Sequence, residues 1–312
     1  MNRPIIRPEA LLPGDAIGIA APASCFDPGL YERGLSVLRR LGYRVEIPEG
    51  LFRRNGYLAG TDAERAGLFL NLWQDPSIKA VFCVRGGYGA MRILTLLDPD
   101  LIRATPKIFM GFSDLTAILV HLAQNCGVAA FHGPVLTALS CCADPEAEIS
   151  AIRSALSPEA PLSITPSRPL VLHPGRAEGA VIGGNLTILT HLIGTPFAPR
   201  LSGCILFIED CREAPYRVDR MLTHMRLAGA LDGLSGVAVG TFDGCGAENG
   251  VMAVIREAFA GDGIPVLAGF DSGHGPRNRA FPMGISAVLD TEKGVLEYRS
   301  PATVRQKTGG PS

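Results

Sequence analysis

The feature that most constrains the fold of this chain is a regular alternation, over its first half, of short apolar runs with amphipathic segments. Four apolar runs have the length of buried strands: Ala16–Ala21, Ala80–Val84, Ile108–Phe112 and Val128–Phe131. Arg44–Ile47 alternates between polar and apolar residues and predicts a further strand. Between them, hydrophobic residues recur at helical spacing, and Thr61 with Glu64 forms the capping box that begins a helix. This alternation predicts an α/β fold, a parallel sheet with helices on both faces. Ligands of such sheets bind at the carboxyl ends of the strands.

A strand-to-helix turn centred on Ser113 is the first candidate site. The apolar run before it reads as a buried strand, and hydrophobic residues recur at helical spacing from Leu115 to Leu122. Such a turn exposes the hydroxyl and places the N–H of Asp114 at a helix N-terminus, as in a nucleophile elbow. Leu115 replaces the final glycine of the usual G-x-S-x-G motif. A simple helix N-cap therefore remains an alternative role for Ser113.

The second half of the chain begins after a proline-rich stretch. With 312 residues the chain fits about two domains, and five prolines between 157 and 175 argue against a helix or a central strand there. We therefore predict an N-terminal α/β domain over 1–157, a linker over 158–175 and a C-terminal domain over 176–312. Further strands are predicted at Ala177–Ile182, Cys204–Ile208, Val237–Phe242, Pro265–Phe270, Ile285–Leu289 and Val295–Tyr298, and helices at Leu186–Leu192 and Val218–Leu231.

A serine, a glutamate and a histidine each follow a predicted strand: Ser113, Glu209 and His274. A serine hydroxyl needs a base to act as a nucleophile, and histidine suits this role because its unperturbed pKa is about 6.5. A carboxylate on the second ring nitrogen fixes the tautomer and stabilises the imidazolium. The non-catalytic alternatives are that Glu209 is a solvated charge or a partner of Arg217, and that His274 has no catalytic role.

The oxyanion of an acyl-transfer reaction needs two hydrogen-bond donors. The backbone N–H of Asp114 is one candidate, and Gly86 or Gly87 is the other, because a residue without a side chain lets the backbone approach a ligand. The stretch Arg85-Gly-Gly-Tyr-Gly could instead hold a phosphate. It matches neither the dinucleotide fingerprint nor the P-loop, so a nucleotide site is the weaker interpretation.

Charge and composition narrow the possible partners. The net charge of −1 gives no argument for nucleic acid, and no apolar run approaches the length of about 20 residues that spans a bilayer. The N-terminus lacks the apolar region of a secretory signal, which leads us to expect a cytoplasmic protein. The eight cysteines contain no C-x-x-C pair. We therefore expect neither disulfides nor a structural zinc site, and we expect no cofactor.

Seven short motifs together resemble one family, the LD-carboxypeptidases or murein tetrapeptide carboxypeptidases. The motifs are Arg85-Gly-Gly-Tyr-Gly-Ala90, Gly111-Phe-Ser-Asp-Leu-Thr116, Phe131-His-Gly-Pro134, Gly183-Gly-Asn-Leu186, Ile208-Glu-Asp210, Pro215-Tyr-Arg-Val-Asp-Arg220 and Gly273-His-Gly275. The resemblance extends over nearly the whole chain, from Pro13 to about Gly284. The resemblance implies a domain like class I glutamine amidotransferases, a smaller C-terminal swivelling β/α domain, an active site in the groove between them, and a homodimer.

The resemblance also implies roles for residues. Ser113 would be the nucleophile, His274 the general base and Glu209 its orienting partner, and Asn185 would help to shape the substrate groove. Similar enzymes remove the terminal D-alanine that follows meso-diaminopimelate or lysine in muropeptide tetrapeptides, during cell-wall recycling and without a metal.

Two other functions stay open. Microcin-immunity enzymes of the same family hydrolyse a peptide–nucleotide conjugate, and a non-catalytic muropeptide-binding protein could keep the fold. The form of the Arg85–Ala90 motif and the compact connection from Gly175 to Gly183 favour the recycling branch.

Overall fold

The first half of the chain forms a parallel sheet, as predicted. The computed structural model describes residues 3–306. In sequence order the strands of this sheet are β1 (Ala16–Ala20), β2 (Arg44–Glu46), β3 (Ile78–Cys83), β4 (Ile108–Gly111) and β5 (Ala130–His132), joined by β12 (Phe281–Met283). Their spatial order is β12-β5-β4-β3-β1-β2. Neighbours within β1–β5 pair in parallel, whereas β12 is antiparallel to β5.

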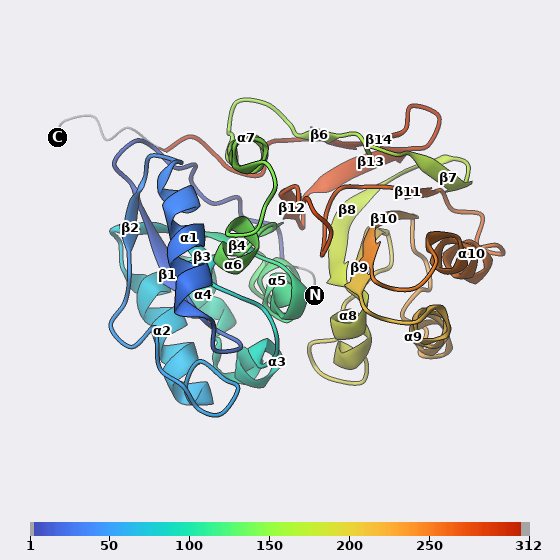
Figure 1. Ribbon diagram of the computed structural model, residues 1–312. Coiled ribbons are helices and arrows are strands. Elements are labelled where there is room, and N and C mark those ends of the chain that lie inside the picture. Colours follow the sequence, from blue (N-terminus) through green and yellow to red (C-terminus); the bar gives the residue numbers. More distant parts are fainter. Residues whose placement is uncertain (1–2, 307–312) are drawn as a thin grey trace.

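Helices flank this sheet and connect its strands (Figure 1). They are α1 (Pro28–Arg39), α2 (Asp62–Gln74), α3 (Ala90–Ile93), α4 (Pro99–Ala104), α5 (Thr116–Val120), α6 (Leu136–Leu139) and α7 (Pro145–Leu156). The predicted capping box is present at α2, where Thr61 and Glu64 satisfy each other's backbone N–H groups. All five residues of β1 are buried, which explains why this strand is an unbroken apolar run.

The second half forms a mixed eight-stranded sheet of order β6-β14-β13-β8-β9-β10-β11-β7. Its members are β6 (Ser163–Ile164), β7 (Leu170–His173), β8 (Arg176–Asn185), β9 (Cys204–Cys211), β10 (Gly236–Asp243), β11 (Val266–Ala268), β13 (Ser286–Asp290) and β14 (Val295–Tyr298). The central strands β8 to β11 run parallel. The helices of this half are α8 (Leu186–Leu192), α9 (Pro215–Leu227) and α10 (Glu248–Ala258).

The stretch 158–175, which we predicted to be a linker, contributes two strands of the second sheet. Both β6 and β7 lie at the outer edges of that sheet. An edge strand tolerates proline because the missing N–H faces away from the ladder. The proline pattern therefore excluded a central strand correctly, but it did not exclude an edge strand.

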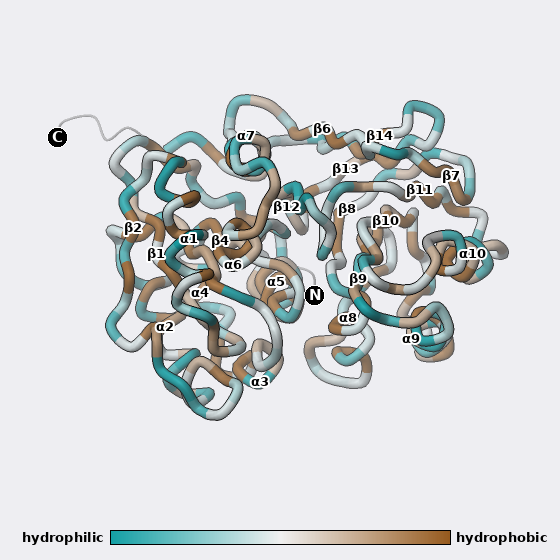
Figure 2. The backbone as a smooth tube through the Cα atoms, viewed as in Figure 1, coloured by the Kyte–Doolittle hydropathy of each residue, from teal (hydrophilic) through white to brown (hydrophobic). Residues whose placement is uncertain are grey.

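The two halves are also joined by a strand of the second half that pairs in the first sheet. β12 comes from the C-terminal half, yet it pairs with β5 and completes the first sheet. Tyr298 of β14 donates its hydroxyl proton to the carbonyl of Pro282 in β12 at 2.8 Å. Figure 2 shows hydrophobic residues gathered along the inner strands of both halves and hydrophilic ones on the outer loops. α5, which follows the turn after β4, lies beside β8 and α8 of the second half (Figure 1).

Candidate active site

The predicted elbow is present at the end of β4. The chain passes from β4 through a turn of 3₁₀ helix at Ser113–Leu115 into α5. Ser113 has a φ of 64°, and within residues 3–306 the only other non-glycine residue with positive φ is Arg212. A left-handed backbone costs a residue with a side chain about 1 kcal/mol or more, and such strain is concentrated at functional sites. This conformation is that of a nucleophile elbow, in which the strained turn holds the side chain away from the sheet.

Glu209 lies near the end of the central strand β9. All but the last of the eight residues of this strand are buried, and Glu209 itself has no exposed surface. A carboxylate in such a place is costly unless it has a partner. The partner of its Oε2 atom is His274, whereas Oε1 has no hydrogen-bond partner.

His274 lies in the loop after β11, next to a glycine that the site requires. Gly273 has a φ of 120°, and a Cβ atom there would come within 2.6 Å of Glu209 Oε2. Only glycine therefore lets this loop approach the glutamate so closely. Phe112, the residue before Ser113, packs its ring 4.8 Å from the imidazole.

The structure brings the three predicted catalytic side chains together. His274 Nε2 lies 3.0 Å from Ser113 Oγ, and His274 Nδ1 lies 2.7 Å from Glu209 Oε2. Both distances are within hydrogen-bond reach. The chain of bonds connects the two halves of the protein, because Ser113 belongs to the first and the other two residues to the second. The sequence left open whether the three residues meet in the resting protein, and here they do.

Burial and pairing act in opposite directions on these groups. Burial alone would lower the pKa of the His274 imidazole, but the side chains of Cys211 and Glu209 together raise it above its ordinary value. Burial raises the pKa of the Glu209 carboxyl, and the hydrogen bond from His274 opposes that rise. A raised histidine pKa makes the imidazole a stronger base toward the serine hydroxyl.

The glycine-rich loop lies against the elbow, as the oxyanion hypothesis requires. A Cβ atom on Gly86 would lie 2.9 Å from Ser113 Cβ and 3.3 Å from the backbone N of Asp114. Gly87 faces Ser24 instead, whose Oγ would lie 2.5 Å from such an atom. The side chain of Asp114 is buried and accepts a hydrogen bond of 2.8 Å from the N–H of Ala90, which ties this loop to the elbow. The donor roles of Gly86, Gly87 and Asp114 stay predictions.

Replacing Gly86 by alanine is expected to lower kcat by about 100-fold, the cost of losing one oxyanion donor. The added methyl group would push the loop away from Ser113 and the N–H of Asp114. Steady-state kinetics measure the loss, and thermal unfolding confirms that the fold survives. Gly67→Ala is the matched control, because a Cβ at Gly67 meets nothing within 4 Å. Equal kinetics for the two variants would contradict the role of Gly86.

Asn185 joins the halves of the protein at the site. It is the N-cap of α8, where its Oδ1 accepts from the N–H of Ile188 and its Nδ2 donates to Asp210 Oδ1. Its own backbone N–H donates to Thr116 Oγ1 of the elbow helix at 3.0 Å. Both ends of the side chain are thus engaged within the protein, and a contact with substrate stays a prediction.

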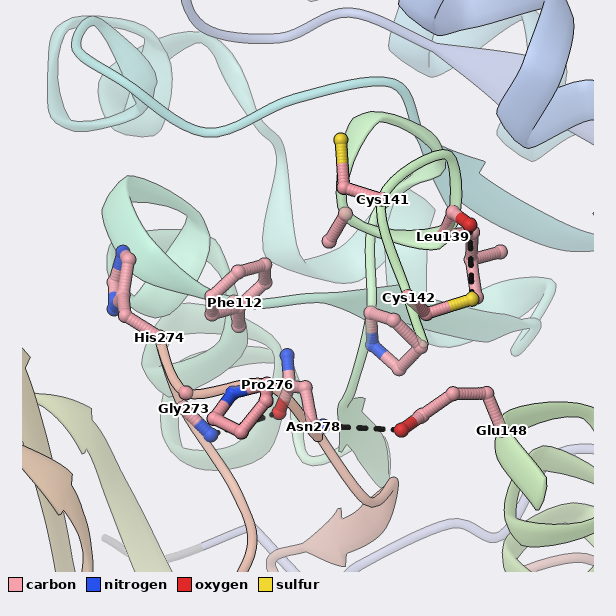
Figure 3. A pocket seen from close by; sticks show the side chains of 12 residues that line it. Phe112, Leu139, Cys141, Cys142, Glu148, Gly273, His274, Pro276 and Asn278 are labelled. Atoms are coloured by element: carbon pink, nitrogen blue, oxygen red, sulfur yellow. Dashed lines mark hydrogen bonds between the residues drawn. The ribbon is translucent and has the colours of Figure 1, made fainter. Parts of the chain in front are cut away.

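Two residues that support the histidine were missed by sequence reasoning. Asn278 Oδ1 accepts from the N–H of Gly273 at 2.9 Å, and the N–H of Asn278 donates to Glu148 Oε1 of α7 at 3.3 Å. Figure 3 shows this connection beside a cavity of about 220 Å³. Glu148 is 4% exposed and lies four residues before the buried Ile152, so the available signal was a charge on the apolar face of an amphipathic segment. Asn278 gave none.

Residues 3–306 contain neither a candidate metal site nor a candidate membrane span. No group of three or more histidine, cysteine, aspartate or glutamate side chains in this part of the chain is arranged to hold a metal ion. No helix there is both long enough and apolar enough to cross a bilayer.

Comparison with known proteins gives the family. The model of the LD-carboxypeptidase N-terminal domain matches residues 17–133, and that of the C-terminal domain matches residues 178–289. A probable murein peptide carboxypeptidase of Bacillus subtilis is 38% identical over 292 residues, which cover 91% of this chain and 92% of the relative.

Solved structures of two relatives have the same fold. The muramoyltetrapeptide carboxypeptidase of Oxalobacter formigenes matches with a TM-score of 0.78 and 30% identity, covering 91% of this chain and 97% of its own. The microcin C7 self-immunity protein matches with a TM-score of 0.87 and 27% identity, covering 96% and 99%.

The protein is therefore a hydrolase of the serine carboxypeptidase class. Within that class, the chain belongs to the LD-carboxypeptidase family.

Proposed function

We propose that this protein removes the terminal D-alanine from muropeptide tetrapeptides, cleaving the bond after meso-diaminopimelate or lysine, in the cytoplasm during peptidoglycan recycling. The observation that carries the proposal is the unbroken chain of hydrogen bonds from Ser113 through His274 to Glu209. The names of relatives that act on murein peptides support the choice of substrate. We further propose that the protein works as a homodimer, without a metal or a cofactor.

In the proposed mechanism, Ser113 Oγ attacks the carbonyl carbon of the scissile amide while His274 Nε2 accepts the hydroxyl proton. Glu209 stabilises the imidazolium through Nδ1. The N–H of Asp114, with an N–H of the Gly86–Gly87 loop, holds the oxyanion. His274 then returns the proton to the amine of D-alanine, which leaves, and an acyl-enzyme on Ser113 remains. Water deprotonated by His274 hydrolyses that ester and restores the serine.

The chief alternative is hydrolysis of a peptide–nucleotide conjugate. The high TM-score to the microcin C7 self-immunity protein favours this alternative. The stretch from Gly175 to Gly183, which we expected to be a compact connection, lies almost wholly in strand β8 (Arg176–Asn185), so the form of the Arg85–Ala90 motif alone supports the recycling branch. A non-catalytic binder of muropeptides is a weaker alternative. Simple binding does not require a serine that is held in a strained conformation and hydrogen-bonded to a histidine.

The proposed function predicts the loss of one alanine from a tetrapeptide of L-Ala, D-Glu, meso-diaminopimelate and D-Ala. Mass spectrometry of the peptide after incubation with purified protein measures this loss. We expect it to be absent with Ser113→Ala and unchanged by a chelator, because the serine supplies the nucleophile. An intact peptide, together with cleavage of an aminoacyl-nucleotide conjugate by the same sample, would favour the alternative.

A further inference from the structure

Four exposed side chains form a patch beside the nucleophile, here called the rim patch: Arg54, Tyr57, Arg85 and Tyr88. Two loops supply them, and the segment at Ser24 and Cys25 holds these loops together. Ser24 Oγ accepts from the N–H of Tyr88 at 3.0 Å, and the N–H of Cys25 donates to the carbonyl of Tyr57 at 3.0 Å. The patch is therefore a fixed surface and not a pair of independent loops.

The rim patch lies close to the reacting serine. Gly86 packs against Ser113. Arg85 precedes Gly86 directly, and Tyr88 follows it by two residues. The N–H of Ser24 also donates to the carbonyl of Gly86 at 3.3 Å. A peptide bound at Ser113 must therefore pass near this patch if it extends over the glycine-rich loop.

The two arginines of the patch differ from their neighbours in charge pairing. Arg53 pairs with Glu64 at 3.0 Å, and Arg92 pairs with Asp62 at 2.9 Å. In contrast, within residues 3–306 no ion pair joins Arg54 or Arg85 to a carboxylate. Arg85 donates to the carbonyl of Cys25 at 3.1 Å, and Arg54 contacts Cys25 Sγ at 3.3 Å. Both arginines thus keep donors for an anionic ligand, and arginine binds carboxylates through paired hydrogen bonds.

The two tyrosines add an apolar surface to this charge. Tyr57 is 60% exposed and Tyr88 is 49% exposed, and their rings contact each other with centroids 5.7 Å apart. Aromatic rings that are held rigid and left exposed beside a charge are typical of binding surfaces.

We propose that the rim patch binds the acidic peptide segment of the substrate, on the acyl side of the scissile bond. This inference rests on the proposed function. D-Glutamate and meso-diaminopimelate each carry two carboxyl groups of which only one enters the peptide chain, so the tetrapeptide brings free carboxylates to the site. Arg54 and Arg85 bind those carboxylates, and the tyrosine rings pack against the aliphatic parts of the same residues.

The test compares two tetrapeptides, one with free carboxylates and one in which these groups are amidated. For the double variant Arg54→Gln/Arg85→Gln we expect KM for the acidic peptide to rise about tenfold or more, since hydrogen bonds to charged groups are strong. We expect kcat to stay within about twofold, because uniform binding is lost and the transition state is not touched. KM for the amidated peptide should change little. The wild-type KM for the acidic peptide should also rise with salt.

Arg53→Gln is the matched control, because this neighbouring arginine is already paired with Glu64. The proposal is overturned if the double variant weakens both peptides equally, or if it changes the oligomeric state in gel filtration, which would assign the patch to a subunit interface. The wild-type assay separates this failure from that of the proposed function. Release of alanine from both peptides upholds the function even when the patch shows no preference, whereas no release from either peptide rejects both.

Discussion

His274→Ala is expected to lower the release of alanine by about 10⁴- to 10⁶-fold, the range found when one member of a serine triad is removed. The imidazole is the group that lies 3.0 Å from Ser113 Oγ, so the variant loses its base. His132 cannot replace it, because burial lowers the pKa of His132 to about 3 and the Phe112 ring packs against both imidazoles. Release of alanine from the tetrapeptide, followed by mass spectrometry, gives the rate.

The control for this prediction is His224→Ala, which removes an exposed histidine of α9 that belongs to neither the triad nor its hydrogen bonds. His224→Ala should unfold at nearly the wild-type temperature. His274→Ala should stay folded but lose some stability, because it leaves the buried Glu209 carboxyl without a hydrogen-bond partner. Labelling of Ser113 by a serine-directed phosphonate should also slow strongly in His274→Ala, because the same proton transfer activates the serine. Near wild-type turnover by His274→Ala would reject the catalytic assignment of this histidine.

The parts of the fold that the sequence predicted well are those with a local physical signal. The strands β1 and β4 are fully buried apolar runs, and the capping box of α2 satisfies its own backbone groups. The strand-to-helix turn at Ser113 was visible for the same reason. In each case the residues that specify the element lie next to one another in the sequence.

The features that the sequence did not predict depend on distant pairing. The edge strands β6 and β7 are short and lie between prolines, so only their partners β14 and β11 define them. β12 carries Pro282 and joins the other half of the protein through β5. α10 was not predicted, although its buried residues share one face. Such elements need the tertiary structure before they can be recognised.

In the candidate site, too, the residues with a local sequence signal were predicted and the contacts between distant residues were not. Ser113, Glu209 and His274 were identified because each follows an apolar run, and their motifs resemble a known family. Their hydrogen bonds required the fold, because the serine and its two partners lie in different halves of the protein. The support that Asn278 and Glu148 give to the His274 loop depends on one contact between a loop and a helix 130 positions apart in sequence. No local pattern encodes such a contact.

Glu209→Gln is expected to lower kcat by about 10⁴-fold while the fold remains intact, by analogy with the asparagine variant of the aspartate in other serine triads. The substitution keeps the shape of a side chain that has no exposed surface. A glutamine amide group can donate a hydrogen bond to His274 Nδ1, which would move the ring proton to Nε2. That nitrogen would then face Ser113 Oγ as a donor and could not accept the hydroxyl proton. Stability should not fall, because a buried charge is removed.

The same variant tests the electrostatic role of Glu209 through the pH profile of kcat/KM. Activity requires neutral His274, so the rate falls as the pH drops through the pKa of this imidazole. Glu209 helps to raise that pKa above its ordinary value, while burial acts to lower it. Without the carboxylate the pKa falls, and the acidic limb of the residual activity must move to lower pH. Glu213→Gln, four residues along the chain and paired with Arg217, should leave the limb unchanged. A shift of the Glu209→Gln limb to higher pH would mean that the carboxylate does not stabilise the imidazolium, and Glu209 would then be a structural residue of β9.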